Sequence, residues 1–166
     1  DLSVSYEGLR KRGVRVVRDE AVAVDPAKRQ VRLARGDPLP YDRLIVAPGI
    51  DFLAGAIPGL KSAEAQNRVL HAWKAGPQTV ALRKQLEAMR DGGVYVFHIP
   101  LAPYRCPPGP YERICQVADY FKRAKPKSKI IALDSNPNIT SKAKLFLAEW
   151  NGPYKGMIDY RPNSEI

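Results

Sequence analysis

The chain has 166 residues, 45% of them apolar, and a formal net charge of +10. This length suits one ordinary domain or two small ones, and the apolar content is that of a globular chain rather than a disordered one. The apolar runs are strand-sized and far shorter than the roughly 20 residues that cross a bilayer, which argues against a membrane span. Because the chain begins at Asp1 rather than Met, we expect it to be an internal piece of a longer protein, with any targeting signal outside it.

The basic residues are spread along the sequence rather than gathered with aromatic residues. A first group lies before Gly36, and a second, loose group consists of Arg123, Lys125, Lys127 and Lys129. Nucleic-acid binding needs cations collected on one face. The pattern therefore favours a solvated basic surface, or one that docks an acidic protein partner, over a nucleic-acid site.

Two cysteines and two histidines limit the possible metal and disulfide chemistry. Cys106 and Cys115 are nine positions apart, and His71 and His98 have no spacing that completes a zinc site with them. We expect no metal site and no disulfide framework within the chain. Cys115 falls among apolar residues of a predicted helix, so we interpret it as a core residue.

The first 50 residues predict short elements. These are, in chain order, a helix over 5–12 ended by Gly13, a strand over 14–17, two hairpin strands over 21–25 and 30–33, a turn over 36–40 and a strand over 41–49. The segment Asp25-Pro26-Ala27-Lys28 between the hairpin strands is typical of a type I turn. The strand over 41–49 is apolar enough to be buried, and it ends in a Pro-Gly break.

The second half alternates helices and strands. After a loop-rich linker over 50–76, the pattern predicts a helix over 79–90, a strand over 94–99, a helix over 111–123, a strand over 130–133, a helix over 141–150 and a strand that begins at Met157. Connections of this length imply parallel strands joined by right-handed crossovers. The order βαβαβ is that of the first half of a dinucleotide-binding domain.

The turn after the strand over 94–99 argues against a nicotinamide dinucleotide. Such a site needs glycines here, because the pyrophosphate is bound by backbone N–H groups at a helix N-terminus. Residues 100–110 include five prolines, which have no N–H, and a single glycine, Gly109. Asp134 lies where a ribose-binding acid would be, but an Asp at a strand end is as often a helix or turn cap.

The same turn places Cys106 close to the predicted start of a helix. Pro110 is suited to the first helical position and Glu112 to the first turn. The helix dipole, Arg105 and Arg113 would favour the thiolate of Cys106 over the thiol. Glu112 would oppose this, or would serve as a proton acceptor or donor. The sequence predicts a reactive cysteine, and a small buried cysteine in a rigid loop is the alternative.

Four blocks of sequence carry a resemblance to a known family. They are Tyr-Asp-Arg-Leu-Ile-Val-Ala-Pro-Gly-Ile at 41–50, His-Ala-Trp-Lys-Ala-Gly at 71–76, Leu-Arg-Lys-Gln-Leu-Glu-Ala-Met at 82–89, and Arg-Cys-Pro-Pro-Gly-Pro-Tyr-Glu-Arg at 105–113. The first is a variant of a break found in many disulfide-reductase-like flavoproteins, and the last is far more specific. In this order, the blocks resemble the flavoprotein subunit of flavocytochrome c sulfide dehydrogenase over most of the chain.

The resemblance implies an α/β fold of the disulfide-reductase-like flavoprotein type. Residues 1–76 would be the last part of the first FAD-binding segment plus a linker. Residues 77–166 would form a Rossmann-like, three-layer βαβ domain, which is an NAD-binding-like insert and is incomplete at its C-terminus.

The resemblance also implies an activity. In the family, sulfide is oxidised at a redox-active disulfide beside FAD, and the electrons pass through FAD to haem in a partner cytochrome c subunit. Cys106 matches one cysteine of that disulfide, and Glu112 matches an acid associated with proton handling there. The second cysteine would lie after Ile166, and the glycine-rich FAD loop and the cysteine that tethers FAD would lie before Asp1. A periplasmic location is implied as well.

Six residues match backbone positions on the adenine and ribose side of FAD in the family. They are Val22, Ala23, Val24, Ala47, Pro48 and Gly49. For the last three, a plain strand-ending turn is the alternative. Because the phosphate-binding loop would lie elsewhere in the parent protein, we expect the isolated chain to retain no FAD and to be inactive.

Three other interpretations are compatible with the sequence. A sulfide:quinone oxidoreductase would share the architecture and the cysteine chemistry and would add a C-terminal membrane-binding segment. An NAD-dependent flavoprotein reductase is disfavoured by the proline-rich turn. A non-catalytic Rossmann-like interaction domain would use the basic surface to dock an acidic partner.

Overall fold

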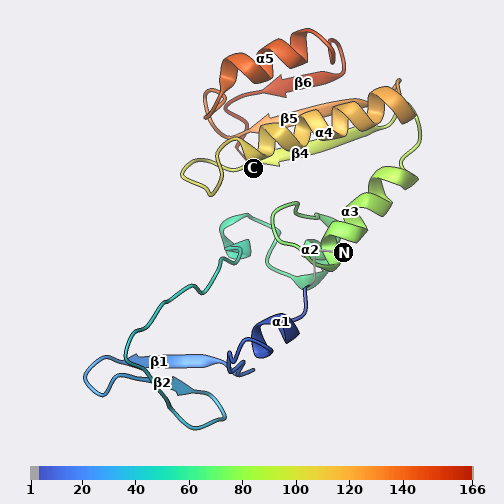
Figure 1. Ribbon diagram of the computed structural model, residues 1–166. Coiled ribbons are helices and arrows are strands. Elements are labelled where there is room, and N and C mark those ends of the chain that lie inside the picture. Colours follow the sequence, from blue (N-terminus) through green and yellow to red (C-terminus); the bar gives the residue numbers. More distant parts are fainter. Residues whose placement is uncertain (1–3, 166) are drawn as a thin grey trace. The chain divides into compact units, whose positions relative to one another are not determined.

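The computed structural model describes residues 4–165, and the chain divides into two compact units, Asp1–Phe52 and Leu53–Ile166 (Figure 1). The division falls within the linker over residues 50–76 that the sequence predicts, near its start. Residues 53–76 therefore group with the second unit. The assignment of residues 1–76 to an FAD-binding segment stays a prediction.

The first unit is built around an antiparallel hairpin. Its elements are α1 (Glu7–Arg10), β1 (Ala21–Asp25), β2 (Gln30–Leu33) and β3 (Leu39–Pro40), with the strands in the order β1-β2-β3. Asp25 pairs with Gln30 at the turn, and its Oδ1 accepts a hydrogen bond from the backbone N–H of Lys28 at 2.9 Å. This side-chain bond is what an Asp at the first turn position provides. The predicted hairpin is confirmed at both strands.

Two other predictions in the first unit are wrong. Residues 14–17 form no strand, and residues 41–49 form neither a strand nor a buried segment. Ile45 and Val46 are 91% and 69% exposed. A strand needs a neighbour for its peptide groups, and no strand in the described part of the chain pairs with either run. Apolar composition alone therefore misidentified both segments.

The second unit contains a parallel sheet with helices. Its elements are η1 (Ala54–Ala56), α2 (Ala63–Arg68), α3 (Pro77–Ala88), β4 (Val94–Ile99), α4 (Gly109–Ala124), β5 (Lys129–Asp134), α5 (Ala143–Asn151) and β6 (Ile158–Arg161). The strands are parallel in the order β4-β5-β6. The predicted βαβαβ order is confirmed, and the element bounds differ by a few residues. The predicted linker over 50–76 also contains two short helices, η1 and α2.

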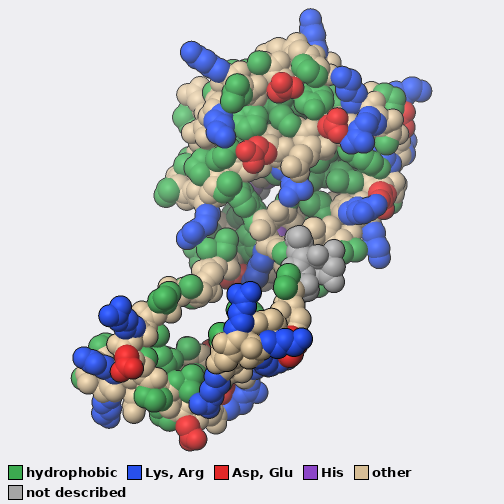
Figure 2. Space-filling view, in the orientation of Figure 1, with side chains coloured by type: hydrophobic (Ala, Val, Ile, Leu, Met, Phe, Trp, Pro, Cys, Tyr) green, Lys and Arg blue, Asp and Glu red, His purple; other side chains and the backbone are tan. Residues whose placement is uncertain are grey.

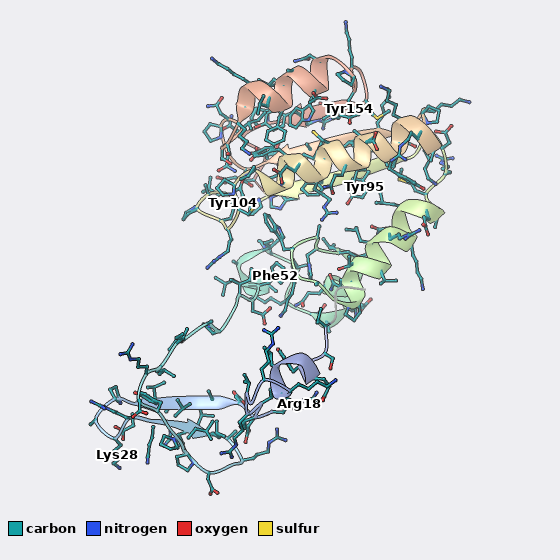
Figure 3. All side chains as sticks on the ribbon, viewed as in Figure 1. Arg18, Lys28, Phe52, Tyr95, Tyr104 and Tyr154 are labelled. Atoms are coloured by element: carbon teal, nitrogen blue, oxygen red, sulfur yellow. The ribbon has the colours of Figure 1, made fainter. Side chains whose placement is uncertain are left out.

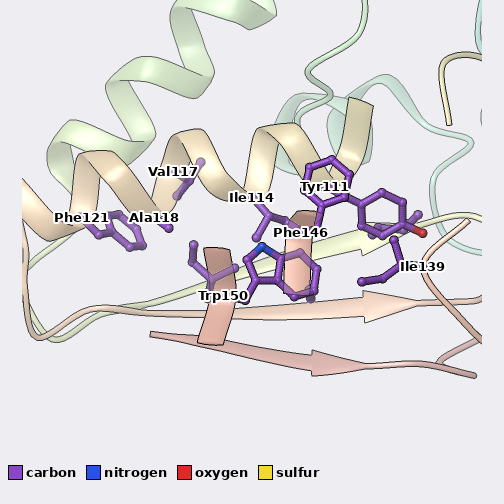
Figure 4. Close-up of a cluster of buried hydrophobic side chains, with 11 residues drawn as sticks. Tyr111, Ile114, Val117, Ala118, Phe121, Ile139, Phe146 and Trp150 are labelled. Atoms are coloured by element: carbon purple, nitrogen blue, oxygen red, sulfur yellow. The ribbon is translucent and has the colours of Figure 1, made fainter. Parts of the chain in front are cut away.

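Helices α4 and α5 cover one face of this sheet and enclose the core (Figures 1 and 4). The inner stripe of α4 repeats at helical spacing, with its buried side chains at Tyr111, Ile114, Val117, Ala118 and Phe121. These residues meet Ile99, Ile130 and Ala132 from the strands and Phe146 and Trp150 from α5. Each large apolar side chain buried in this way contributes roughly 1.5–3 kcal/mol.

The other face of the sheet is more exposed. Successive residues of a strand point to opposite faces, so Tyr95 and Phe97 turn toward the core cluster and Val94 and Val96 turn away from it. Val94 and Val96 are 53% and 58% exposed.

Within the described residues, no helix is long and apolar enough to cross a membrane, and no cluster of side chains could hold a metal ion.

The basic side chains are scattered over the visible surface, with acidic ones among them (Figure 2). The residues of the loose basic group differ in their exposure to solvent. Lys125 is only 9% exposed, and its Nζ donates to the backbone carbonyls of Glu87, at 2.8 Å, and Met89. It therefore satisfies carbonyls at the end of α3, which have no partner within the helix. Lys125 does not belong to an exposed docking surface.

Candidate functional site

The loop of residues 100–108 joins the carboxyl end of β4 to the start of α4. In open parallel sheets, ligand sites form at the carboxyl ends of the strands. Cys106 lies in this loop, is exposed and is a free thiol. The alternative of a small buried cysteine therefore does not hold, whereas the reactive role of Cys106 stays a prediction.

The loop is held by residues that follow β5. The backbone N–H of Ala102 donates to Asn136 Oδ1 at 2.9 Å, and Asn136 Nδ2 donates to the carbonyl of Pro100 at 2.9 Å. Tyr104, shown at the start of α4 in Figure 3, shares a 2.9 Å hydrogen bond with the hydroxyl of Thr140. Four prolines within residues 100–108 limit the loop's own conformations, and these bonds attach the loop to the residues that follow β5.

The backbone at Cys106 has a left-handed conformation. Its φ is 58°, and its carbonyl accepts a hydrogen bond from the N–H of Gly109 at 2.9 Å. A non-glycine residue in this region costs about 1–2 kcal/mol, which the surrounding contacts must offset. Helix α4 begins at Gly109, so Pro110 occupies its second position rather than its first. The sequence correctly predicts a cysteine just before a helix start.

A second segment contacts this turn. A Cβ atom placed on Gly109 would lie 2.8 Å and 3.0 Å from ring atoms of Trp73 and 3.4 Å from the sulfur of Cys106. Arg113 Nη2 also donates to the carbonyl of Ala72 at 3.4 Å. The structure thus brings the block at 71–76 against the block at 105–113. The sequence predicts no role for Trp73, because the resemblance of the block at 71–76 to the family is its only sign of a function.

Glu112 lies in the first turn of α4 and is exposed. Its backbone N–H donates to the carbonyl of Pro108 at 3.0 Å. Glu112 is therefore in the first turn of the helix that follows Cys106, with its carboxylate open to solvent. The role of Glu112 as a proton acceptor or donor stays a prediction.

Cys115 differs from Cys106 in its exposure to solvent. It is half-buried within α4 and packs against the core. Burial raises the pKa of the Cys115 thiol; a 3.3 Å hydrogen bond from Trp150 Nε1 opposes this, and the charges of Glu149 and Glu112 add to it. A thiol with a raised pKa is a poor nucleophile at neutral pH. The prediction that Cys115 packs with the core is confirmed.

Asp134 is turned into the protein. Its carboxylate is fully buried and accepts hydrogen bonds from the hydroxyls of Tyr111, at 2.8 Å, and Tyr160, at 2.9 Å. The backbone N–H and the Nδ2 of Asn136 donate to it at 2.9 Å and 2.7 Å. The structure supports the interpretation of Asp134 as a structural residue rather than a ribose-binding acid, because four hydrogen-bond donors already occupy its carboxylate.

The six predicted FAD contacts all lie in the first unit, whereas Cys106 and Glu112 lie in the second. Val22, Ala23 and Val24 belong to β1, which pairs with β2 on one side and with no other strand in the described residues. Alternate peptide groups of such an edge strand face outward. Gly49 has a φ of 77°, and a Cβ atom placed on it would have no heavy atom within 4 Å. The role of these six residues in binding FAD stays a prediction.

Comparisons with known proteins found a matching family model and a similar solved structure. The family model described as "Sulfide dehydrogenase [flavocytochrome c] flavoprotein chain, central" matches residues 79–166. The structure is similar to that of the sulfide:quinone oxidoreductase from the hyperthermophilic bacterium Aquifex aeolicus, with a TM-score of 0.61 and 18% sequence identity. The match covers 93% of this chain and 36% of the Aquifex chain, and at this identity it shows a shared fold.

Proposed function

Because the chain belongs to the family of flavocytochrome c sulfide dehydrogenase flavoprotein chains, we propose that its parent protein is an FAD-dependent enzyme that oxidises sulfide. The observation that carries the proposal is the exposed thiol of Cys106. It lies just before α4, at the carboxyl edge of the parallel sheet and inside the region that the family model matches.

In the proposed reaction, Cys106 is one half of a disulfide whose other cysteine belongs to the parent protein outside residues 1–166. Hydrosulfide attacks one sulfur of this disulfide, a new sulfur–sulfur bond forms, and the old one breaks to release the other sulfur as a thiolate. Glu112 accepts the proton that hydrosulfide loses. The two electrons given up by sulfide then reside on the cysteine sulfurs.

FAD supplies the two-electron acceptor when it is bound in the parent protein. The edge of β1 and the turn at Ala47–Gly49 would hold its adenine and ribose side through peptide groups. We propose that a cytochrome c subunit takes the electrons onto its haem; the term flavocytochrome c in the family's description supports such a partner. By the same resemblance, we propose a periplasmic location.

A sulfide:quinone oxidoreductase is the second candidate, and the similarity to the Aquifex structure favours it. That similarity concerns the fold, whereas the family model concerns the sequence over more than half of this chain, so we prefer the cytochrome-linked enzyme. The two candidates differ in their electron acceptor.

The proposal is tested on the full-length parent protein under anaerobic conditions. Sulfide should bleach the flavin absorbance, and mixing with cytochrome c should then reduce haem faster than mixing with a soluble quinone reduces the quinone. Cys106→Ser should abolish bleaching by sulfide while dithionite still reduces the flavin. Bleaching by sulfide at an undiminished rate in Cys106→Ser would contradict the proposed role of the thiol, and preferential quinone reduction would favour the second candidate.

The isolated chain should not retain FAD. Its candidate contacts are backbone groups on an edge strand and an exposed turn, and the sequence contains no glycine-rich phosphate loop. The chain should elute from gel filtration without flavin absorbance after incubation with FAD. Stoichiometric co-elution would show that residues 1–166 contain a sufficient site.

Cys106 should react with a thiol reagent faster than Cys115. The first thiol is exposed, whereas burial raises the pKa of the second. We expect a difference of about tenfold or more in alkylation rate at pH 7.5. Mass spectrometry of the tryptic peptides after timed exposure to iodoacetamide measures both rates in one sample, and equal rates would contradict this prediction.

A further inference from the structure

The ring of Trp73 and the sulfur of Cys106 face the same point in space, the position that a side chain on Gly109 would occupy. Two ring atoms of Trp73 lie 2.8 Å and 3.0 Å from that point, and Cys106 Sγ lies 3.4 Å from it. The sulfur and the ring edge are therefore within about 6 Å of each other, close to the ~5 Å typical of sulfur–aromatic contacts. Gly109 is the residue whose lack of a side chain makes room for both.

Hydrogen bonds hold the segment that presents Trp73 at two places. On one side, Ala72 accepts a hydrogen bond from Arg113 Nη2 on α4 at 3.4 Å. On the other, the N–H of His71 donates to Gln78 Oε1 on α3 at 3.1 Å, and Gln78 Nε2 donates to the carbonyl of Gln66 on α2 at 3.1 Å. The segment 71–73 is thus connected to three helices of the second unit.

The turn that Trp73 contacts needs support. Cys106 has a φ of 58°, and the turn from Cys106 to Gly109 is closed by one backbone hydrogen bond of 2.9 Å. Residues in such conformations persist when surrounding contacts determine them. The indole ring, 38% exposed, contacts the turn at Gly109, on the side that also faces the sulfur.

We propose that Trp73 is a positioning residue for Cys106: its indole ring holds the Cys106–Gly109 turn and covers one side of the thiol. A reactant that approaches the sulfur is then restricted to the uncovered side. The importance of this for sulfide oxidation rests on the proposed function. The contact itself is a property of the chain and is tested on the thiol, without flavin or activity.

The experiment uses the 166-residue chain with Cys115→Ser, so that Cys106 is its only thiol. Rate constants for N-ethylmaleimide and for the larger fluorescein-5-maleimide are measured from pH 6 to pH 9. Trp73→Ala should raise the rate constant for fluorescein-5-maleimide by about 2- to 10-fold, which is the factor that corresponds to the strength of an ordinary sulfur–aromatic contact. The rate constant for N-ethylmaleimide should rise less. Trp73→Phe, which keeps an aromatic ring, should restore most of the original size preference.

Gly109→Ala provides a matched test of the same contact. Its added methyl group would meet the Trp73 ring at 2.8 Å, so it should mimic Trp73→Ala in an otherwise unchanged chain. In a chain that already carries Trp73→Ala, the methyl group has no ring to displace, and Gly109→Ala should then have little further effect. Such non-additivity is the signature of two residues in direct contact.

Three results would overturn the proposal. The first is an unchanged size preference in Trp73→Ala, and the second is an equal effect of Gly109→Ala with and without Trp73. The third is a loosened fold, seen as a parallel rise in Cys115 labelling when Trp73→Ala is placed in a Cys106→Ser chain. Because none of these measurements involves sulfide or FAD, a failure of the proposed activity in the parent protein would leave the outcome for Trp73 unaffected.

Discussion

At the scale of single residues, the carboxylate of Asp134 anchors the carboxyl edge of the parallel sheet. It links α4 through Tyr111, β6 through Tyr160 and the loop after β5 through Asn136. A buried charge is tolerated only where hydrogen bonds replace its hydration, and here four donors do so. Dinucleotide-binding domains often place a ribose-binding acid at such a strand end, whereas the carboxylate of Asp134 is occupied by hydrogen bonds within the chain.

Tyr160→Phe should destabilise the chain by about 1–2 kcal/mol at pH 7, because it removes one hydrogen bond to a buried charge. Burial, and then the hydrogen bond and charge of Asp134, raise the pKa of Tyr160 above its ordinary value of 10.0. The stability that this hydroxyl contributes is therefore complete below about pH 10 and declines as the pH rises above that value, because only the unfolded chain then ionises.

Urea unfolding of the two proteins at pH 7 and pH 11 checks this prediction. The gap in unfolding free energy between them should narrow at pH 11, since the Phe variant has no hydroxyl at this position. Tyr111 is present in both proteins and cancels from the comparison. A gap of the same size at the two pH values would contradict the raised pKa of the half-buried Tyr160.

At the scale of elements, β5 divides its side chains between two different environments. Ile130 is fully buried beneath α4, whereas Ile131 points to the opposite, less covered face and is partly exposed. The two residues are adjacent and chemically identical, so they separate the effect of burial from that of strand propensity.

Ile130→Ala should cost about 2–5 kcal/mol of unfolding free energy, because it leaves a cavity in the core. Ile131→Ala, the matched control, should cost clearly less, as expected for a side chain that still contacts water. Thermal or urea unfolding followed by circular dichroism measures both. Equal losses would mean that the face bearing Ile131 is as well packed as the core face.

Helix α3 shows how an element can depend on a single distant residue. Lys125 follows α4 in the sequence, yet its ammonium group satisfies carbonyls at the end of α3. Substitution of Lys125 would therefore disturb the fold, and Lys127, which is exposed, is the appropriate residue for testing whether an acidic partner binds the basic surface.

At the scale of the whole molecule, the two units differ in how they are stabilised. Every buried residue in the described part of the chain lies in the second unit, and the described residues 4–52 include none. A small sheet without a buried face is marginally stable in water. We therefore expect the first unit to open far more readily than the second.

Limited proteolysis with trypsin should show this difference. Cleavage after Arg43, in an exposed segment outside any strand, should be about tenfold or more faster than cleavage after Lys129, whose backbone is paired in β5. A time course analysed by mass spectrometry gives both rates from one digest. Cleavage at Lys129 as fast as at Arg43 would show that the second unit is not the more stable one.

The elements that the sequence predicted well are those set by local patterns. The hairpin followed from alternation and from Asp25 at its turn, and the βαβαβ order followed from strand-sized apolar runs separated by helical periodicity. The prediction of a strand over 41–49 was wrong because a strand needs hydrogen bonds to a neighbouring strand. No local sequence pattern indicates whether such a neighbour is present.

By itself, the sequence determined the alternation of helices and strands, the dispersed positive charge and the position of Cys106 just before a helix. The tertiary structure alone decided that Trp73 contacts the Cys106 turn, that Asp134 is saturated by Tyr111 and Tyr160, and that Lys125 belongs to the end of α3. The reason is physical: each of these contacts joins residues more than 20 positions apart, and only the folded chain brings such residues together.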